Sequence, residues 1–190
     1  MRKCLQVTML LICVNLSVCW AQEALQVEAD SITNLQGDYL GQTPPDLKPV
    51  LFAPEIVSTN LLEERDMTFT PDLKELYFTR DERIMVMKRT EHGWTAPVPA
   101  SFSSGHSEAE PHVVPVGNRL YFVSQRPLEQ DAGNGFFQIW FVDRTDGDWS
   151  EPQVFADRRD YYPTLTSAGI MYFTDANNDL FRTRVVGEAI

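Results

Sequence analysis

The feature that most constrains the fold is a stretch of sequence that occurs three times. The segment MTFTPDLKELYFTR (67–80) aligns with PHVVPVGNRLYFVS (111–124), and PTLTSAGIMYFTD (163–175) is a third copy after deletion of one residue. Each copy predicts two short strands joined by a turn, because short apolar runs are bounded by Gly, Pro, Asn or Asp. Successive copies, aligned on their tyrosines, are 44 and 51 residues apart. Self-similarity at this spacing indicates one supersecondary unit used three times.

Further strands complete the unit. A third strand is predicted after each hairpin, at 83–90, 136–144 and 179–186. In the first two units a phrase of Gly, Trp and Pro follows, EHGWTAP (91–97) and DGDWSEP (146–152), and it predicts a turn into a fourth strand. Units of four antiparallel strands repeated at this spacing predict the blades of a β-propeller. A β-sandwich is the rival, but it has no reason to repeat its turn sequences in register.

The expected fold is therefore all-β, a partial β-propeller of about three four-stranded antiparallel blades at about 64–105, 106–157 and 158–190. The third blade is expected to be incomplete, because no Trp-Pro phrase follows its third strand. Propellers close with about 4–8 blades. We therefore expect pairing with missing blades or with a second chain. Residues 46–60 are expected to form an additional outer strand, so that the partial propeller covers 46–190.

The N-terminus predicts export. Arg2 and Lys3 precede an apolar stretch (7–18) that is too short for a membrane span, and a small-residue cleavage site follows it. We expect residues 1–21 to be a signal peptide, cleaved after Ala21, and the protein to be periplasmic or secreted. The alternative is a lipid anchor on Cys19. Residues 22–45 are polar and acidic and are expected to form a spacer or extended arm.

Composition limits the partners and the chemistry. The chain has 27 Asp and Glu against 16 Lys and Arg, and residues 1–21 hold two of the basic and none of the acidic side chains. So acidic a chain is unsuited to nucleic acid, where phosphate neutralisation supplies the affinity. All three cysteines lie within residues 1–21, so no disulfide or thiol chemistry is expected after cleavage. We expect no cofactor and no metal.

Several motifs, in order, carry a family likeness. FTPDLKELYFTR, YFVSQRP, QIWFVDRTDGDWSEP and YYPTLTSAGIMYFTD resemble the WD-repeat-like, TolB-type (PD-repeat) propeller proteins of the bacterial cell envelope or secreted fraction. The resemblance runs from about Val50 to the C-terminus and implies an exported propeller, six-bladed in the relatives. One departure is Leu73, which stands where the family has a turn Gly. The first hairpin is therefore expected to be distorted.

The repeat also predicts a site. Asp66 and Glu110 occupy the same repeat position, just before the innermost strand, and Tyr162 takes it in the third unit. In a propeller that position lies near the mouth of the central channel, where ligands bind. Arg80 and Arg126 follow the second strands and would complete a polar ring with these three residues. The alternative is that all of them pin neighbouring blades by hydrogen bonds.

Other motifs have simpler interpretations. The side chains of HSEAEPH at His106, Glu108, Glu110 and His112 would share one face of an extended strand and could bind zinc, but a linker between blades is the preferred interpretation. DANND (175–179) and DAGNG (131–135) predict turns rather than calcium loops. Trp94 and Trp149 predict packing between blades rather than platforms for carbohydrate.

The predicted function is an exported, non-enzymatic β-propeller repeat module that binds a protein, peptide or glycan. The alternative is a propeller hydrolase or lyase acting on glycans or peptides, with Asp66 and Glu110 as an acid/base pair. The chain has no G-x-S-x-G elbow, HExxH motif or Gly-rich phosphate loop. Propellers host both functions, so the fold class alone does not decide between them.

Overall fold

The computed structural model describes residues 35–128 and 135–185, and within these ranges every regular element is a β-strand. The described residues include no helix long and apolar enough to cross a membrane. The predicted signal peptide, its cleavage site and the lipid anchor at Cys19 lie outside the described residues, as do the first four residues of DAGNG.

The strands form three successive antiparallel sheets. Sheet 1 consists of β1 (Glu64–Phe69), β2 (Glu75–Arg80), β3 (Arg83–Thr90), β4 (Gly93–Trp94) and β5 (Val98–Pro99). Sheet 2 consists of β6 (Glu108–Val113), β7 (Arg119–Ser124), β8 (Gln138–Thr145), β9 (Asp148–Trp149) and β10 (Gln153–Val154). Sheet 3 consists of β11 (Asp160–Leu165), β12 (Ile170–Asp175) and β13 (Leu180–Arg184). In each sheet the first three strands pair in chain order, and in sheets 1 and 2 the third strand also pairs with β5 or β10.

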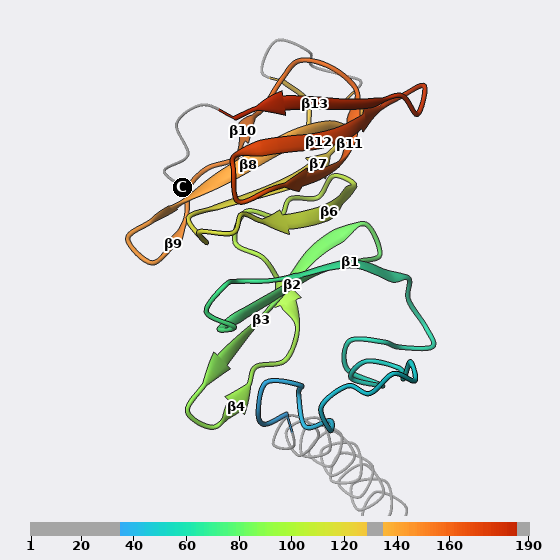
Figure 1. The fold of residues 1–190 in the computed structure, drawn as a ribbon, viewed down its shortest axis with the longest axis vertical. Coiled ribbons are helices and arrows are strands. Elements are labelled where there is room, and N and C mark those ends of the chain that lie inside the picture. Colours follow the sequence, from blue (N-terminus) through green and yellow to red (C-terminus); the bar gives the residue numbers. More distant parts are fainter. Residues whose placement is uncertain (1–34, 129–134, 186–190) are drawn as a thin grey trace, which may run out of the picture.

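The three sheets stack, with an N-terminal segment below sheet 1 (Figure 1). Side chains alternate along β2 and β7, so that one face of each strand packs on the preceding layer and the other on the following one. In β12 only the face of Met171 and Phe173 packs on a described layer. The first core, between the N-terminal segment and sheet 1, includes Leu35, Leu40, Leu76 and Phe78. The second, between sheets 1 and 2, includes Tyr77, Val86, Leu120 and Phe122. The third, between sheets 2 and 3, includes Tyr121, Ile139, Met171 and Phe173.

A β-bulge interrupts the first strand of every sheet at the same repeat position. The pairing shifts between Arg65 and Thr68, between Ala109 and His112, and between Tyr161 and Thr164. Asp66, Glu110 and Tyr162 lie in these bulges with positive φ values of 54, 59 and 56°. The three residues are thus structurally equivalent, as the repeat predicted. They lie within the first strands rather than just before them.

Leu73 does not distort the first hairpin, and that prediction was wrong. Its φ is 55°, and the equivalent turn residues Gly117 and Gly169 have φ of 75 and 70°. The amide of Thr70 donates to the carbonyl of Glu75 at 2.9 Å, closing the hairpin as its counterparts do in the other sheets. The turn keeps its shape, and Leu73 carries the strain of a left-handed backbone.

Residues 46–60 do not form the additional outer strand that was expected. The carbonyl of Ala53 accepts the amides of Ile56, Val57 and Ser58, which closes the segment into a turn, and its one bridge joins Pro54 to Ser58. Positive φ at Ala53 and at Glu55 is incompatible with a regular strand. The described part of the N-terminal segment is held to sheet 1 by Trp94, whose indole Nε1 donates to Gly37 at 2.9 Å.

Leu73→Gly should stabilise the protein. The side chain is exposed, so little packing is lost, and glycine adopts positive φ without the steric cost of a Cβ. We expect the free energy of unfolding to rise by about 1 kcal/mol in urea denaturation. Leu73→Ala keeps the Cβ and serves as the control, which should show no gain. A loss of stability in Leu73→Gly would contradict this account of the turn.

Candidate functional site

Glu110 joins the bulge of β6 to both neighbouring sheets. Its carboxylate Oε2 accepts the backbone amide of Tyr162 in sheet 3, and its own amide donates to Thr79 Oγ1 in sheet 1 at 3.2 Å. Glu110 is 8% exposed, whereas Tyr162 is 57% exposed and the Asp66 side chain is 26% exposed. We call Asp66, Glu110 and Tyr162 the bulge row. It places a buried carboxyl between an accessible carboxylate and an accessible phenol.

The environment of Glu110 changes its acidity. Burial raises the pKa of its carboxyl to about 7, the amide of Tyr162 opposes that shift, and the neighbouring Asp66 adds to it. A carboxyl in this state exchanges its proton near neutral pH. It can therefore donate a hydrogen bond when protonated and accept two or more when ionised.

A second contact joins the sheets beside the bulge row. His112 Nε2 accepts the amide of Leu165 at 2.9 Å, and Thr68, the equivalent residue of sheet 1, accepts the amide of Val113 through Oγ1 at 3.3 Å. Burial lowers the pKa of His112, which favours the neutral ring that this acceptor role requires. In sheets 1 and 2, the side chain two residues after the bulge residue thus accepts a hydrogen bond from a backbone amide of the next sheet.

Arg80 and Arg126 do not point into the bulge row. Arg80 binds Glu64 at 3.0 Å and the carbonyl of Val57 at 3.2 Å. Arg126 binds the carboxylate of Glu108 and, at 3.1 Å, a backbone carbonyl that precedes sheet 2. Their side chains are largely buried. Each arginine therefore fastens its sheet to the segment before it rather than to a neighbouring sheet, and a contact with ligand stays a prediction.

The acidic partners of these arginines were missed in the sequence. Glu108 has no exposed surface, and its carboxylate accepts Ser103 Oγ at 2.6 Å, Ser104 Oγ at 2.8 Å and the amide of Ser104 at 3.0 Å. In the same way, the carboxylate of Glu64 accepts a hydrogen bond from the hydroxyl of Thr59 at 2.8 Å. The signal was a hydroxyl residue four or five positions before an acidic residue that opens a first strand.

HSEAEPH does not present its four side chains on one face. The bulge at Glu110 breaks the alternation, and the side chains of Glu108 and His112 turn to the partners described above. Across 35–128 and 135–185 no group of three His, Cys, Asp or Glu residues is arranged to hold a metal ion. The shared face held only for a regular strand, and the bulge breaks it. The preferred interpretation, a linker between blades, was also wrong, because Glu108–Val113 forms the largely buried strand β6.

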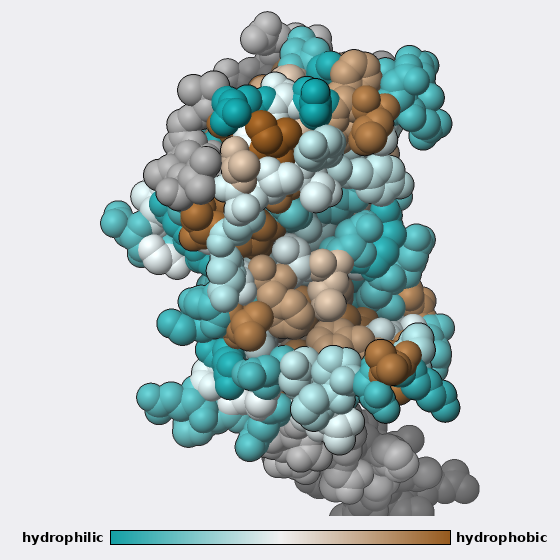
Figure 2. Space-filling model, viewed as in Figure 1, coloured by the Kyte–Doolittle hydropathy of each residue, from teal (hydrophilic) through white to brown (hydrophobic). Residues whose placement is uncertain are grey.

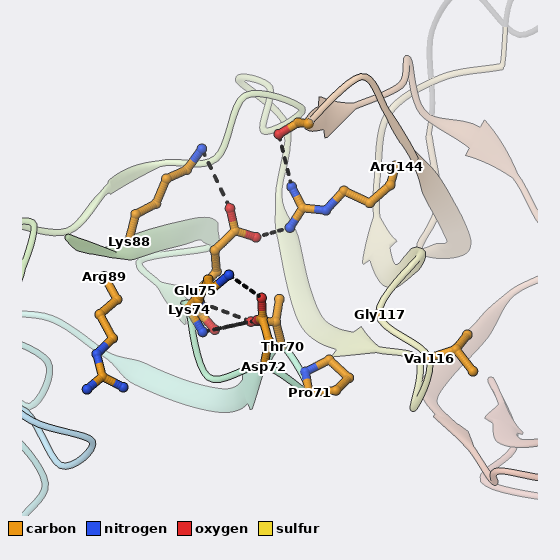
Figure 3. A pocket seen from close by; sticks show the side chains of 11 residues that line it. Thr70, Pro71, Asp72, Lys74, Glu75, Lys88, Arg89, Val116, Gly117 and Arg144 are labelled. Carbon is orange, nitrogen blue, oxygen red and sulfur yellow. Dashed lines mark hydrogen bonds and ion pairs between the residues drawn. The ribbon is translucent and has the colours of Figure 1, made fainter. Parts of the chain in front are cut away.

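A cavity of about 570 Å³ lies between sheets 1 and 2, away from the bulge row (Figure 3). Glu75 stands at its centre, where its carboxylate meets Arg144 and, at 3.6 Å, the ammonium of Lys88. The Tyr77 hydroxyl donates to the same carboxylate at 2.8 Å and accepts Trp149 Nε1 at 2.7 Å. Burial raises the pKa of Tyr77, so the phenol remains a donor. These contacts link sheet 1 to sheet 2.

Trp94 and Trp149 were both predicted to pack between repeat units, and this is confirmed for Trp149 alone. Trp149 packs against the core between sheets 1 and 2, whereas Trp94 packs between the N-terminal segment and sheet 1. The turn predicted at DANND is confirmed. At DANND, Asp175 Oδ1 accepts the amides of Asn177 and Asp179 at 2.8 and 3.0 Å, which makes the segment a turn.

No known protein-family model matches the chain, and no curated protein matches it in sequence. The likeness to TolB-type repeats therefore remains a resemblance of short motifs.

The raised pKa of Glu110 predicts a dependence of stability on pH. Its folded-state pKa of about 7 exceeds the ordinary value of 4.5. The contribution is therefore fully present below pH 4.5 and is lost as the pH rises through 7, by at most about 3 kcal/mol. Glu110→Gln keeps an oxygen for the Tyr162 amide and should remove this dependence in urea denaturation between pH 4.5 and 8. Glu91→Gln, at an exposed carboxylate, should leave it intact. An unchanged pH profile in Glu110→Gln would contradict the assignment.

Proposed function

We propose that the chain is an exported, non-enzymatic module of β-propeller type that binds a protein, peptide or glycan partner through the bulge row. The observation that carries the proposal is the equivalence of the three sheets. In all three, the first three strands pair in chain order and the first strand has a bulge at the same position. The same side of each middle strand packs on the preceding layer. Blades of a propeller share these features, and they place their first strands beside the central channel.

The chemistry of the bulge row suits a polar partner. Asp66 offers a partly exposed carboxylate and Tyr162 an exposed ring with a hydroxyl. A phenol ring supplies apolar contact area together with a hydrogen-bonding group, the combination found in peptide and sugar recognition. Residues 1–21 have the layout of a signal peptide, which supports a periplasmic or secreted location.

A propeller hydrolase or lyase is the second candidate, and one observation favours it. Burial raises the pKa of Glu110 to about 7, and Asp66 lies close enough to add to that shift. A carboxyl with a raised pKa near a second acidic side chain suits acid/base chemistry on a glycan or peptide. Burial of the Glu110 side chain and its use by the Tyr162 amide favour a structural role instead. The binding module therefore stands first.

Binding through the bulge row can be tested with arrays of glycans and of peptides probed with the purified full chain. Asp66→Asn removes a charge without disturbing the backbone, because Asn tolerates positive φ. We expect it to weaken every captured ligand at least about tenfold, as loss of a charged contact does. Asp146→Asn is the matched control, since Asp146 is an exposed aspartate that, like Asp66, has positive φ, 52°, and it should bind as wild type.

The same ligands decide between the two candidates. Each captured ligand is incubated with the full chain and followed by mass spectrometry. Intact ligand supports the binding module, and cleavage that Asp66→Asn abolishes supports the enzyme. Failure to capture any ligand, or equal binding by both variants, would overturn a binding role for the bulge row.

A further inference from the structure

The outer edge of β13 is the position that another strand occupies in the first two sheets. Sheet 1 places β5 beside β3, with Val98 opposite Val86, and sheet 2 places β10 beside β8, with Gln153 opposite Phe141. Within the described residues β13 pairs only with β12. An unpaired edge exposes amides and carbonyls to solvent and is a template for an added strand.

The register of that strand follows from the repeat. The amide of Ala100 donates to the carbonyl of Ile84, and the amide of Phe155 donates to that of Ile139, at 2.9 and 2.8 Å. Ile84 lies opposite Thr79 on the middle strand, and Ile139 lies opposite Val123. In sheet 3 the residue in this place is Leu180, which lies opposite Thr174. The carbonyl of Leu180 is therefore the expected acceptor for an incoming strand.

Several side chains around this edge are apolar and exposed to solvent. In sheet 2 the ring of Phe155 meets that of Tyr121 edge to face at 5.9 Å, and in sheet 1 Phe102 lies 6.3 Å from Tyr77. The equivalent Tyr172 is 36% exposed, and Leu180 is 72% exposed. Tyr172 is therefore the only one of the three repeat tyrosines, all of which lie in described residues, that is not buried. Figure 2 shows hydrophobic side chains exposed at the upper end of the molecule, over the part that Figure 1 gives to sheet 3.

The side chains of β13 indicate which residues an added strand should carry. Arg182 is the residue of sheet 3 that corresponds to Val86 in sheet 1 and Phe141 in sheet 2. It would therefore lie opposite the first residue of the added strand, and its side chain is exposed. Phe181, 38% exposed, takes the place opposite the second residue, which in sheet 2 is the half-buried Val154. A strand that fits would place Glu or Gln opposite Arg182, an aliphatic residue opposite Phe181 and an aromatic residue opposite Leu180, against Tyr172.

We propose that the β13 edge binds an extended segment of another polypeptide by β-strand addition, antiparallel to β13, with the pattern acidic or amide, aliphatic, aromatic. The segment completes sheet 3 as β5 and β10 complete sheets 1 and 2. Backbone hydrogen bonds supply affinity, and the aromatic residue on Tyr172 supplies specificity. The site lies at the opposite edge of the sheet from the bulge row, and the inference holds whether or not that row binds a ligand.

The probe is a synthetic peptide with the sequence of residues 149–157, WSEPQVFAD, which the chain itself uses in sheet 2. We expect saturable one-to-one binding by isothermal titration calorimetry at concentrations below about 1 mM. The matched peptide, N-methylated at its Phe, cannot donate to Leu180 and should bind at least about tenfold more weakly. Replacing Gln with Glu in the peptide should tighten binding through Arg182. Glu91→Gln, at an exposed carboxylate that belongs to neither site, should leave peptide binding unchanged.

Hydrogen exchange locates the complex. The peptide should slow amide exchange in residues 180–184 and leave β8 unchanged. The proposal is overturned by absence of binding at 1 mM, by equal binding of the N-methylated peptide, or by altered exchange at β8, which would mean that the peptide replaces β10. It is also overturned by a stable dimer in light scattering that the peptide does not dissociate, since a second copy would then occupy the edge.

Discussion

The structure depends on burial of one face of each sheet by the next layer. The middle strands β2 and β7 put Tyr77 and Tyr121 on one side and a Leu-x-Phe pair on the other, and each side meets an apolar partner. Apolar burial of this kind is the main favourable term in folding. It explains why the N-terminal segment covers sheet 1, since no sheet precedes Leu76 and Phe78 within the residues that the structure describes. The order of the layers follows from the order of the repeats.

Hydrogen bonds between polar groups then set how neighbouring sheets are placed relative to one another, which apolar burial alone does not determine. Glu110 and His112 receive amides from sheet 3, and Trp149, Tyr77 and Glu75 connect sheet 2 to sheet 1. Because these groups are removed from water, each contact is needed to offset the loss of hydration. Glu110, which holds sheet 2 to its neighbours, lies in the bulge of a first strand, so a residue that joins the sheets is also part of the candidate binding row.

Much of this fold was predictable from the repeat. The hairpins, the third strands, the equivalence of Asp66, Glu110 and Tyr162 and the packing of Trp149 between sheets all follow from patterns in the sequence. The bulge itself was not predictable, since its positive φ falls on Asp, Glu and Tyr rather than on Gly. Because the bulge at Glu110 interrupts the strand, the side chains of HSEAEPH do not share one face. The pairing of Arg126 with Glu108 was missed because it depends on serines in a loop. The turn at 53–58 was missed because its apolar residues resemble a strand.

Successive sheets stack in one direction through the repeat tyrosines, and the described residues leave the face of Tyr172 uncovered. The most direct test compares Tyr121→Ala with Tyr172→Ala in urea denaturation of the full chain. Tyr121→Ala should lower the free energy of unfolding by about 3–5 kcal/mol, as truncation of a buried aromatic side chain does. Tyr172→Ala should lower it by no more than about 1 kcal/mol, because its ring is already in contact with water. Equal losses in the two variants would contradict the stacking described here.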